Sequence, residues 1–161
     1  MAIKCKLSLF VFTCLLSLAL GCAEIKEFYH GNTVSSVPVI VLQEGTPNAG
    51  RWETFDLIID YEYILKSNRI TISGEASLTQ HYQMLYTSIP RMVTYIFFLD
   101  EDSRVLETAS FINLWTDSTR DIQVFSKNYI VPDRTKKISI GYSGEAQGKD
   151  MKSSFYELPL R

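Results

Sequence analysis

Acidic side chains at alternate positions of one segment are the first candidates for chemistry. In TFDLIIDYEYILK (residues 54–66), Asp56, Asp60 and Glu62 occupy even positions, which share one face of an extended strand. Residues two apart on such a face are separated by about 6.5–7 Å, near the distance between acid and base pairs in glycoside hydrolysis. Alternating acids also follow from solvation of an outer sheet face. We expect a solvated face here and keep an envelope hydrolase as an alternative.

One segment contains a serine in a pattern close to that of a nucleophile. In GYSGE (residues 141–145), Ser143 follows Gly141 by two positions, but Glu145 stands where a nucleophile elbow has its second glycine. No helical pattern follows, although the elbow requires a turn from a strand into a helix. We therefore interpret Ser143 and Gly144 as a turn that ends a strand.

Metal ligation has one candidate, the acidic run Asp100, Glu101 and Asp102. In a calcium loop that begins at Asp100, Arg104 would take the place of an oxygen ligand and Val105 that of the required glycine. We expect a solvated hairpin turn instead. His81 is the one histidine of the domain, with His30 in the segment before it, whereas a zinc site needs three or four ligands. The sequence thus predicts no catalytic residue, no cofactor and no metal site.

The positions of the cysteines and the net charge exclude further kinds of site and partner. The three cysteines, Cys5, Cys14 and Cys22, all precede residue 23, so the rest of the chain can form no disulfide and no cysteine-ligated zinc site. Removing Lys4 and Lys6 from the 16 basic residues leaves 14 against 18 acidic residues, a net charge of −4 after residue 22. Because a nucleic-acid surface needs an excess of basic groups, we expect no nucleic-acid partner.

The first 22 residues have the three parts of an export signal. Lys4 and Lys6 precede the apolar run LSLFVFTCLLSLAL (residues 7–20), and Gly21-Cys22 follows it. A positive start, a short apolar stretch and a small residue are typical of a secretory signal peptide. The run is shorter than the roughly 20 residues that a spanning helix needs. An uncleaved membrane helix, or an ordinary signal peptide cut nearby, remains an alternative.

The end of this segment, residues 18–22 (LALGC), resembles the lipobox of bacterial lipoproteins. The resemblance implies that the thiol of Cys22 receives diacylglycerol and that a signal peptidase cleaves between Gly21 and Cys22. Two or three acyl chains would then hold the protein in the membrane. Ala23, instead of Asp, implies transfer to the outer membrane on its periplasmic side if the envelope is Gram-negative. The domain that follows resembles no characterised family closely.

Alternation of apolar and polar residues dominates from Val37 onward and predicts strands. The segments 54–66 and 69–79 form one expected hairpin, and 91–100 with 104–113 form a second, whose first strand is apolar on both faces. Further strands are expected at 37–42, 121–125 and 136–142. We predict an all-β, immunoglobulin-like or related antiparallel sandwich, with a single antiparallel barrel as the alternative. Residues 79–90 (TQHYQMLYTSIP) fit a loop, a strand or a short helix.

These patterns divide the chain into a signal peptide (1–21), the lipidated Cys22 with a tether (22–36), and a β-sandwich domain (37–161). Residues 23–36 lack a regular period, although Ile25, Phe28 and Tyr29 could dock on the domain or on the membrane. We expect a lipid-anchored, non-enzymatic binding or structural module whose partners are the membrane and an envelope protein. A carrier or sensor of a small apolar or glycan ligand is an alternative, because the domain is rich in aromatic residues.

Overall fold

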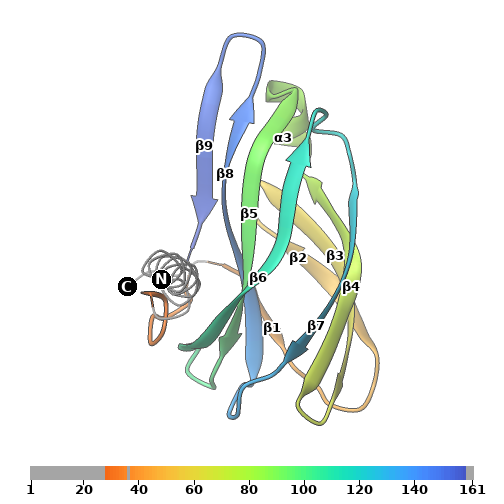
Figure 1. The fold of residues 1–161 in the computed structure, drawn as a ribbon, viewed down its shortest axis with the longest axis vertical. Coiled ribbons are helices and arrows are strands. Elements are labelled where there is room, and N and C mark those ends of the chain that lie inside the picture. The colour runs from red at the N-terminus through yellow and green to blue at the C-terminus, as the bar shows by residue number, and fades with distance from the viewer. Residues whose placement is uncertain (1–27, 36, 159–161) are drawn as a thin grey trace, which may run out of the picture.

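The computed structural model describes residues 28–35 and 37–158 and shows two antiparallel sheets packed face to face (Figure 1). One sheet has the order β2-β3-β4-β7, and the other has the order β1-β8-β5-β6 with β9 also paired to β8. The elements are β1 (Val39–Val41), β2 (Asn48–Glu53), β3 (Leu57–Lys66), β4 (Arg69–Leu78), α3 (Gln80–Leu85), β5 (Ser88–Leu99), β6 (Val105–Thr116), β7 (Gln123–Ile130), β8 (Lys137–Gln147) and β9 (Lys152–Glu157).

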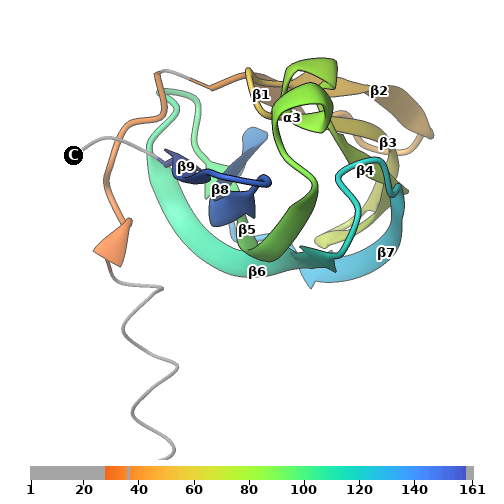
Figure 2. The ribbon, with the colours of Figure 1, turned by 90° about the horizontal axis from the view of Figure 1, so that it is seen from above.

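The predicted all-β sandwich is confirmed, and within the described residues the two sheets do not close into a single barrel. Figure 2 shows the two curved sheets from above, with α3 covering one end of the space between them. The core in this space combines side chains from both sheets. They include Ile59, Ile70 and Ile72 from the four-stranded sheet and Ile96, Phe98, Ile138 and Ile140 from the five-stranded sheet.

The hairpin of β3 and β4 follows the predicted alternation. Leu57 pairs with Leu78 and Lys66 pairs with Arg69, which leaves a two-residue turn. Ser67 adopts a left-handed conformation in this turn, with φ of 55°. Ser103 does the same, with φ of 62°, in the turn of the second predicted hairpin, β5 with β6. Short turns of this kind match the twist of antiparallel strands because they place a residue at positive φ.

β5 is the central strand of the five-stranded sheet, which explains why its sequence is apolar on both faces. It pairs with β6 on one side and with β8 on the other. Phe98 faces the core, where its ring contacts Tyr129. Phe97 faces outward but is buried, because the ring of Tyr29 lies edge-on against it with centroids 5.4 Å apart. A segment from outside the sheets therefore covers the outer face of β5.

This covering segment is the N-terminal part of the described chain. The amide of Gly31 donates to the carbonyl of Val105 at 2.8 Å, and the amide of Val34 donates to the carbonyl of Ser103 at 3.0 Å. Thr33 forms an antiparallel bridge with Arg104. Residues 28–35, which the sequence places in the tether, thus lie docked along the turn of β5 and β6, as the docking alternative describes.

Three segments differ from the strand predictions. β2 (Asn48–Glu53) and β9 (Lys152–Glu157) occupy segments where no strand is predicted. Residues 79–90 contain both the short helix α3 and the start of β5. Pro90 lies in β5 where the pairing register with both neighbouring strands shifts, because a proline cannot donate a ladder hydrogen bond.

Candidate functional site

The three candidate carboxylates do not gather in one place. Asp60 and Glu62 lie on the outer face of the four-stranded sheet and are exposed, as expected for a solvated face. Asp60 is bound by Arg51, whose Nε and Nη2 donate to its two carboxylate oxygens at 2.7 and 2.8 Å. The guanidinium lowers the pKa of the Asp60 carboxyl group by direct hydrogen bonding. Asp56 is separate, because it precedes β3 and is buried.

The chain turns before β3, and this turn reverses the expected orientation of two residues. The amide of Thr54 donates to the carbonyl of Leu57 at 3.0 Å, and the amide of Thr79 donates to the carbonyl of Asp56 at 2.9 Å. These bonds end the strand alternation at Leu57. The prediction that Asp56 lies on the solvated face with Asp60 and Glu62 is therefore wrong: Asp56 is 8% exposed, whereas Phe55, which alternation would place on the opposite face, is 71% exposed.

The buried Asp56 carboxylate is bound by Tyr142 of β8. The hydroxyl of Tyr142 donates to Asp56 Oδ2 at 2.7 Å and lies 2.8 Å from the hydroxyl of Thr54. The phenol of Tyr82 on α3 is close enough for this carboxylate to affect its pKa. Burial, aided by this carboxylate, raises the pKa of both phenols well above their usual range, so both remain protonated donors. The arrangement ties the connection before β3 to α3 and β8, which is a structural role.

Apolar side chains are exposed at this same end of the molecule. Phe55, Met84, Leu85 and Met151 come from three separate segments: the connection before β3, the helix α3 and the turn between β8 and β9. The ring of Phe55 lies 4.8 Å from that of His81 on α3. The carbonyl of Leu85 and the side chain of Met151 both lie next to Gly148. We call these four exposed residues the apolar tip.

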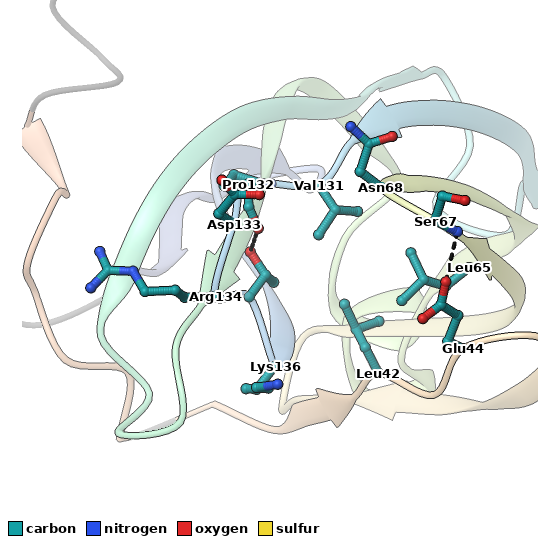
Figure 3. Close-up of a pocket in the computed structure, with 11 residues that line it drawn as sticks. Leu42, Glu44, Leu65, Ser67, Asn68, Val131, Pro132, Asp133, Arg134 and Lys136 are labelled. Carbon is teal, nitrogen blue, oxygen red and sulfur yellow. Dashed lines mark hydrogen bonds between the residues drawn. The ribbon is translucent and has the colours of Figure 1, made fainter.

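A groove of about 310 Å³ opens at the opposite end (Figure 3). Leu42 after β1, Leu65 near the end of β3 and Val131 after β7 point into it. Two charged side chains at its rim do not point into the groove. Glu44 Oε1 accepts the amide hydrogen of Ser67 at 2.8 Å, and the Arg134 side chain extends away from the groove in Figure 3. The groove is the ordinary open end of a sandwich, with an apolar floor and a solvated rim.

The carrier or sensor alternative would need a cavity between the sheets that is large enough for a small ligand. A cavity of about 20 Å³ lies there, lined by core residues that include Leu78, Ile89 and Met92. This volume holds one water molecule and no organic ligand.

The remaining sequence candidates are dispersed. Ser143 and Gly144 lie inside β8, paired with Tyr156 and Phe155, so their interpretation as a turn that ends a strand is wrong. The strand continues because β9, which the sequence did not predict, pairs with it at this point. Asp100 stabilises its turn by accepting the amide hydrogen of Arg104 at 2.9 Å. Among residues 28–35 and 37–158, no three His, Cys, Asp or Glu side chains are close enough to hold a metal ion.

The predicted lipid attachment at Cys22 and the cleavage site Gly21-Cys22 lie outside the described residues. No helix within the described residues is long and apolar enough to cross a membrane.

The sequence analysis did not find the apolar tip, because its residues are up to 96 positions apart (Phe55 to Met151) and only the fold brings them together.

Comparison of the chain with protein-family models, with curated proteins and with solved structures gives no match.

Proposed function

We propose that this protein is lipid-anchored in the cell envelope through Cys22 and acts there as a non-enzymatic binding module for another envelope protein. The anchor is supported by the lipobox-like residues 18–22. The binding role is supported by the apolar tip, which is the observation that carries the proposal.

The apolar tip exposes large side chains that the domain core does not use. Phe55 is 71% and Met84 is 77% exposed. Clustered apolar groups of this kind on a folded domain are typical of interaction sites. Methionine suits such a site because its flexible, polarizable side chain adapts to the partner.

The charges around the tip favour a protein as its partner. Lys149 and Asp150 are both exposed and lie directly before Met151 in the turn between β8 and β9. A rim with both signs of charge around apolar residues is the usual composition of a protein–protein interface. An anionic lipid surface would instead favour basic residues alone.

The anchor is tested by mass spectrometry of the native protein and of the variant Cys22→Ser. The native chain should begin at Cys22 and carry the mass of acyl groups on it, and a clickable fatty acid should label it. Cys22→Ser should abolish labelling and cleavage between residues 21 and 22, and should move the protein out of the detergent phase. An uncleaved native chain with no lipid mass on Cys22 would refute the anchor.

The binding role is tested by crosslinking in intact envelopes. A photoreactive amino acid at Met84 should give a discrete crosslinked protein, whereas the same amino acid at the exposed Ser126 of β7 should not. The additional change Phe55→Ser should remove the crosslink from position 84 without changing the amount of folded protein. Equal crosslinking from both positions, or an unchanged product in the Phe55→Ser background, would contradict binding at the tip.

A further inference from the structure

A second groove, of about 400 Å³, lies on the outer face of the five-stranded sheet over β5, β8 and β9. Val93 and Ser143 are paired neighbours beneath it. Tyr95 and Tyr156 line it, and Tyr156 is 74% exposed. We call this the sheet-face groove. Aromatic side chains with a few polar groups in a concave site are typical of ligand recognition.

Two opposite charges in the sheet-face groove are free. Arg91 of β5 and Glu145 of β8 are directly paired residues, and both are exposed. Within the described chain, neither side chain forms an ion pair or a hydrogen bond. On the other sheet, by contrast, the cross-strand neighbours Arg51 and Asp60 bind each other. The groove therefore presents a cation and an anion side by side, which suits a ligand that carries both signs close together.

The chain leaves the domain on this same side. Residues 28–35 lie outside the five-stranded sheet, away from the four-stranded sheet, in both Figure 1 and Figure 2. The ring of Tyr29 contacts that of Tyr95, with centroids 6.4 Å apart. Phe28, which is 54% exposed, lies six positions after Cys22. Six residues span at most about 20 Å, so a lipid on Cys22 would keep this face close to the membrane.

We propose that the sheet-face groove docks on the bilayer and binds a zwitterionic phospholipid headgroup of the phosphoethanolamine type. The Arg91 guanidinium binds the phosphate, and the Glu145 carboxylate binds the ammonium group. Tyr95 and Tyr156 lie at the level of the headgroups, where amphipathic aromatic rings are favoured. This inference rests on the lipid anchor proposed above. It orients the domain with its four-stranded sheet away from the membrane.

The orientation is tested with single cysteines in the mature lipidated protein. The chain has no cysteine after Cys22, whose thiol is consumed by the lipid, so Ser154→Cys in the groove and Ser126→Cys on the far sheet are matched probes. In phosphatidylethanolamine-containing vesicles, a water-soluble maleimide should modify position 154 several-fold more slowly than position 126. In detergent the two rates should be similar. Equal rates in vesicles, with the lipid mass present on Cys22, would overturn the inference and leave the anchor intact.

The headgroup chemistry is tested by neutralising the paired charges. Arg91→Gln with Glu145→Gln should remove the protection of position 154, whereas the matched pair Arg69→Gln with Glu75→Gln, exposed on the four-stranded sheet, should keep it. Vesicles of phosphatidylglycerol alone, which lack the ammonium group, should protect less. Soluble glycerophosphoethanolamine should slow modification in detergent. If the protection of position 154 is unchanged by the charge substitutions and by the lipid composition, headgroup binding is refuted. Absence of lipid on Cys22 would refute the anchor itself.

Discussion

The end of the sandwich capped by α3 buries a carboxylate and exposes the large side chains of the apolar tip, whereas the groove end has an apolar floor and exposes two β-branched residues, Val41 and Ile130. Asp56, buried under Tyr82 and Tyr142, lies next in the chain to the exposed Phe55. In the groove of Figure 3, Leu42 and Val131 point inward from solvated connections.

The two ends therefore differ in what their polar groups require. At the groove end the polar groups of the rim need only to be solvated. The α3 end buries a carboxylate, which is costly unless it is paired and hydrogen-bonded, and it leaves Phe55 mostly exposed although the ring contacts those of His81 and Tyr82. The free energy of unfolding should therefore depend more on the polar groups of the α3 end than on those of the groove end.

The largest expected effect comes from removing the buried carboxylate. Asp56→Ala removes the buried carboxylate that accepts the hydroxyl hydrogen of Tyr142 at 2.7 Å, and should lower the free energy of unfolding by about 3 kcal/mol. The matched change at the other end, Glu44→Ala, removes one acceptor from an exposed turn and should lower it by less than about 1 kcal/mol. Urea unfolding followed by circular dichroism measures both. Similar losses from the two variants would erase the contrast between the ends.

A second effect concerns alkaline pH. Burial, with a contribution from Asp56, raises the pKa of Tyr142, so above pH of about 10 the unfolded chain loses this proton while the folded chain keeps it. The unfolded state then binds fewer protons, and the free energy of unfolding should fall by up to about 1.4 kcal/mol per pH unit per buried tyrosine.

Tyrosinate absorbance and circular dichroism, recorded together, check this dependence. Ionisation of the buried phenols should coincide with loss of structure. Tyr142→Phe removes one of these groups and should make the alkaline fall shallower. A slope that is the same in Tyr142→Phe as in the native chain would show that this end does not govern alkaline unfolding.

A smaller effect is expected at the apolar tip itself. Met84→Ala should change the free energy of unfolding by no more than about 0.5 kcal/mol, because the side chain is mostly exposed. Met92, which is 1% exposed in the core, is the matched control, and Met92→Ala should cost about 2–5 kcal/mol. Thermal unfolding of the two variants gives the comparison. A large loss in Met84→Ala would mean that the tip supports the fold.

The smallest effect belongs to the turns at the groove end, where Ser67 and Arg134 have positive φ. Ser67→Gly relieves the strain of the left-handed conformation but adds entropy to the unfolded chain, and should raise the free energy of unfolding by about 0.5 kcal/mol. Ser73 lies within β4 and has no left-handed strain to relieve, so Ser73→Gly should lower the free energy of unfolding by about 0.5–1 kcal/mol. Chemical unfolding curves of both variants should therefore shift in opposite directions. A shift in the same direction would argue against turn strain.

Strong local periodicity explains which elements could be predicted. β3, β4 and β5 alternate or are apolar over ten or more residues, and the period of two applies to each strand alone. β2 and β9 are short, polar edge strands, and their extended form depends on pairing with β3 and β8. Helix α3 has only six residues, too few for helical propensity to decide without packing.

The sequence by itself determined the β class, the two hairpins and the prediction of an exported, lipidated N-terminus, because each depends on residues adjacent in the chain. Only the tertiary structure decided the environments of charged residues. Asp56 and Asp60 are four positions apart, yet one is buried against Tyr142 and the other bound to Arg51. Arg91 and Glu145 are 54 positions apart and become neighbours through β5–β8 pairing. Burial and charge pairing depend on non-local contacts, which no local pattern encodes.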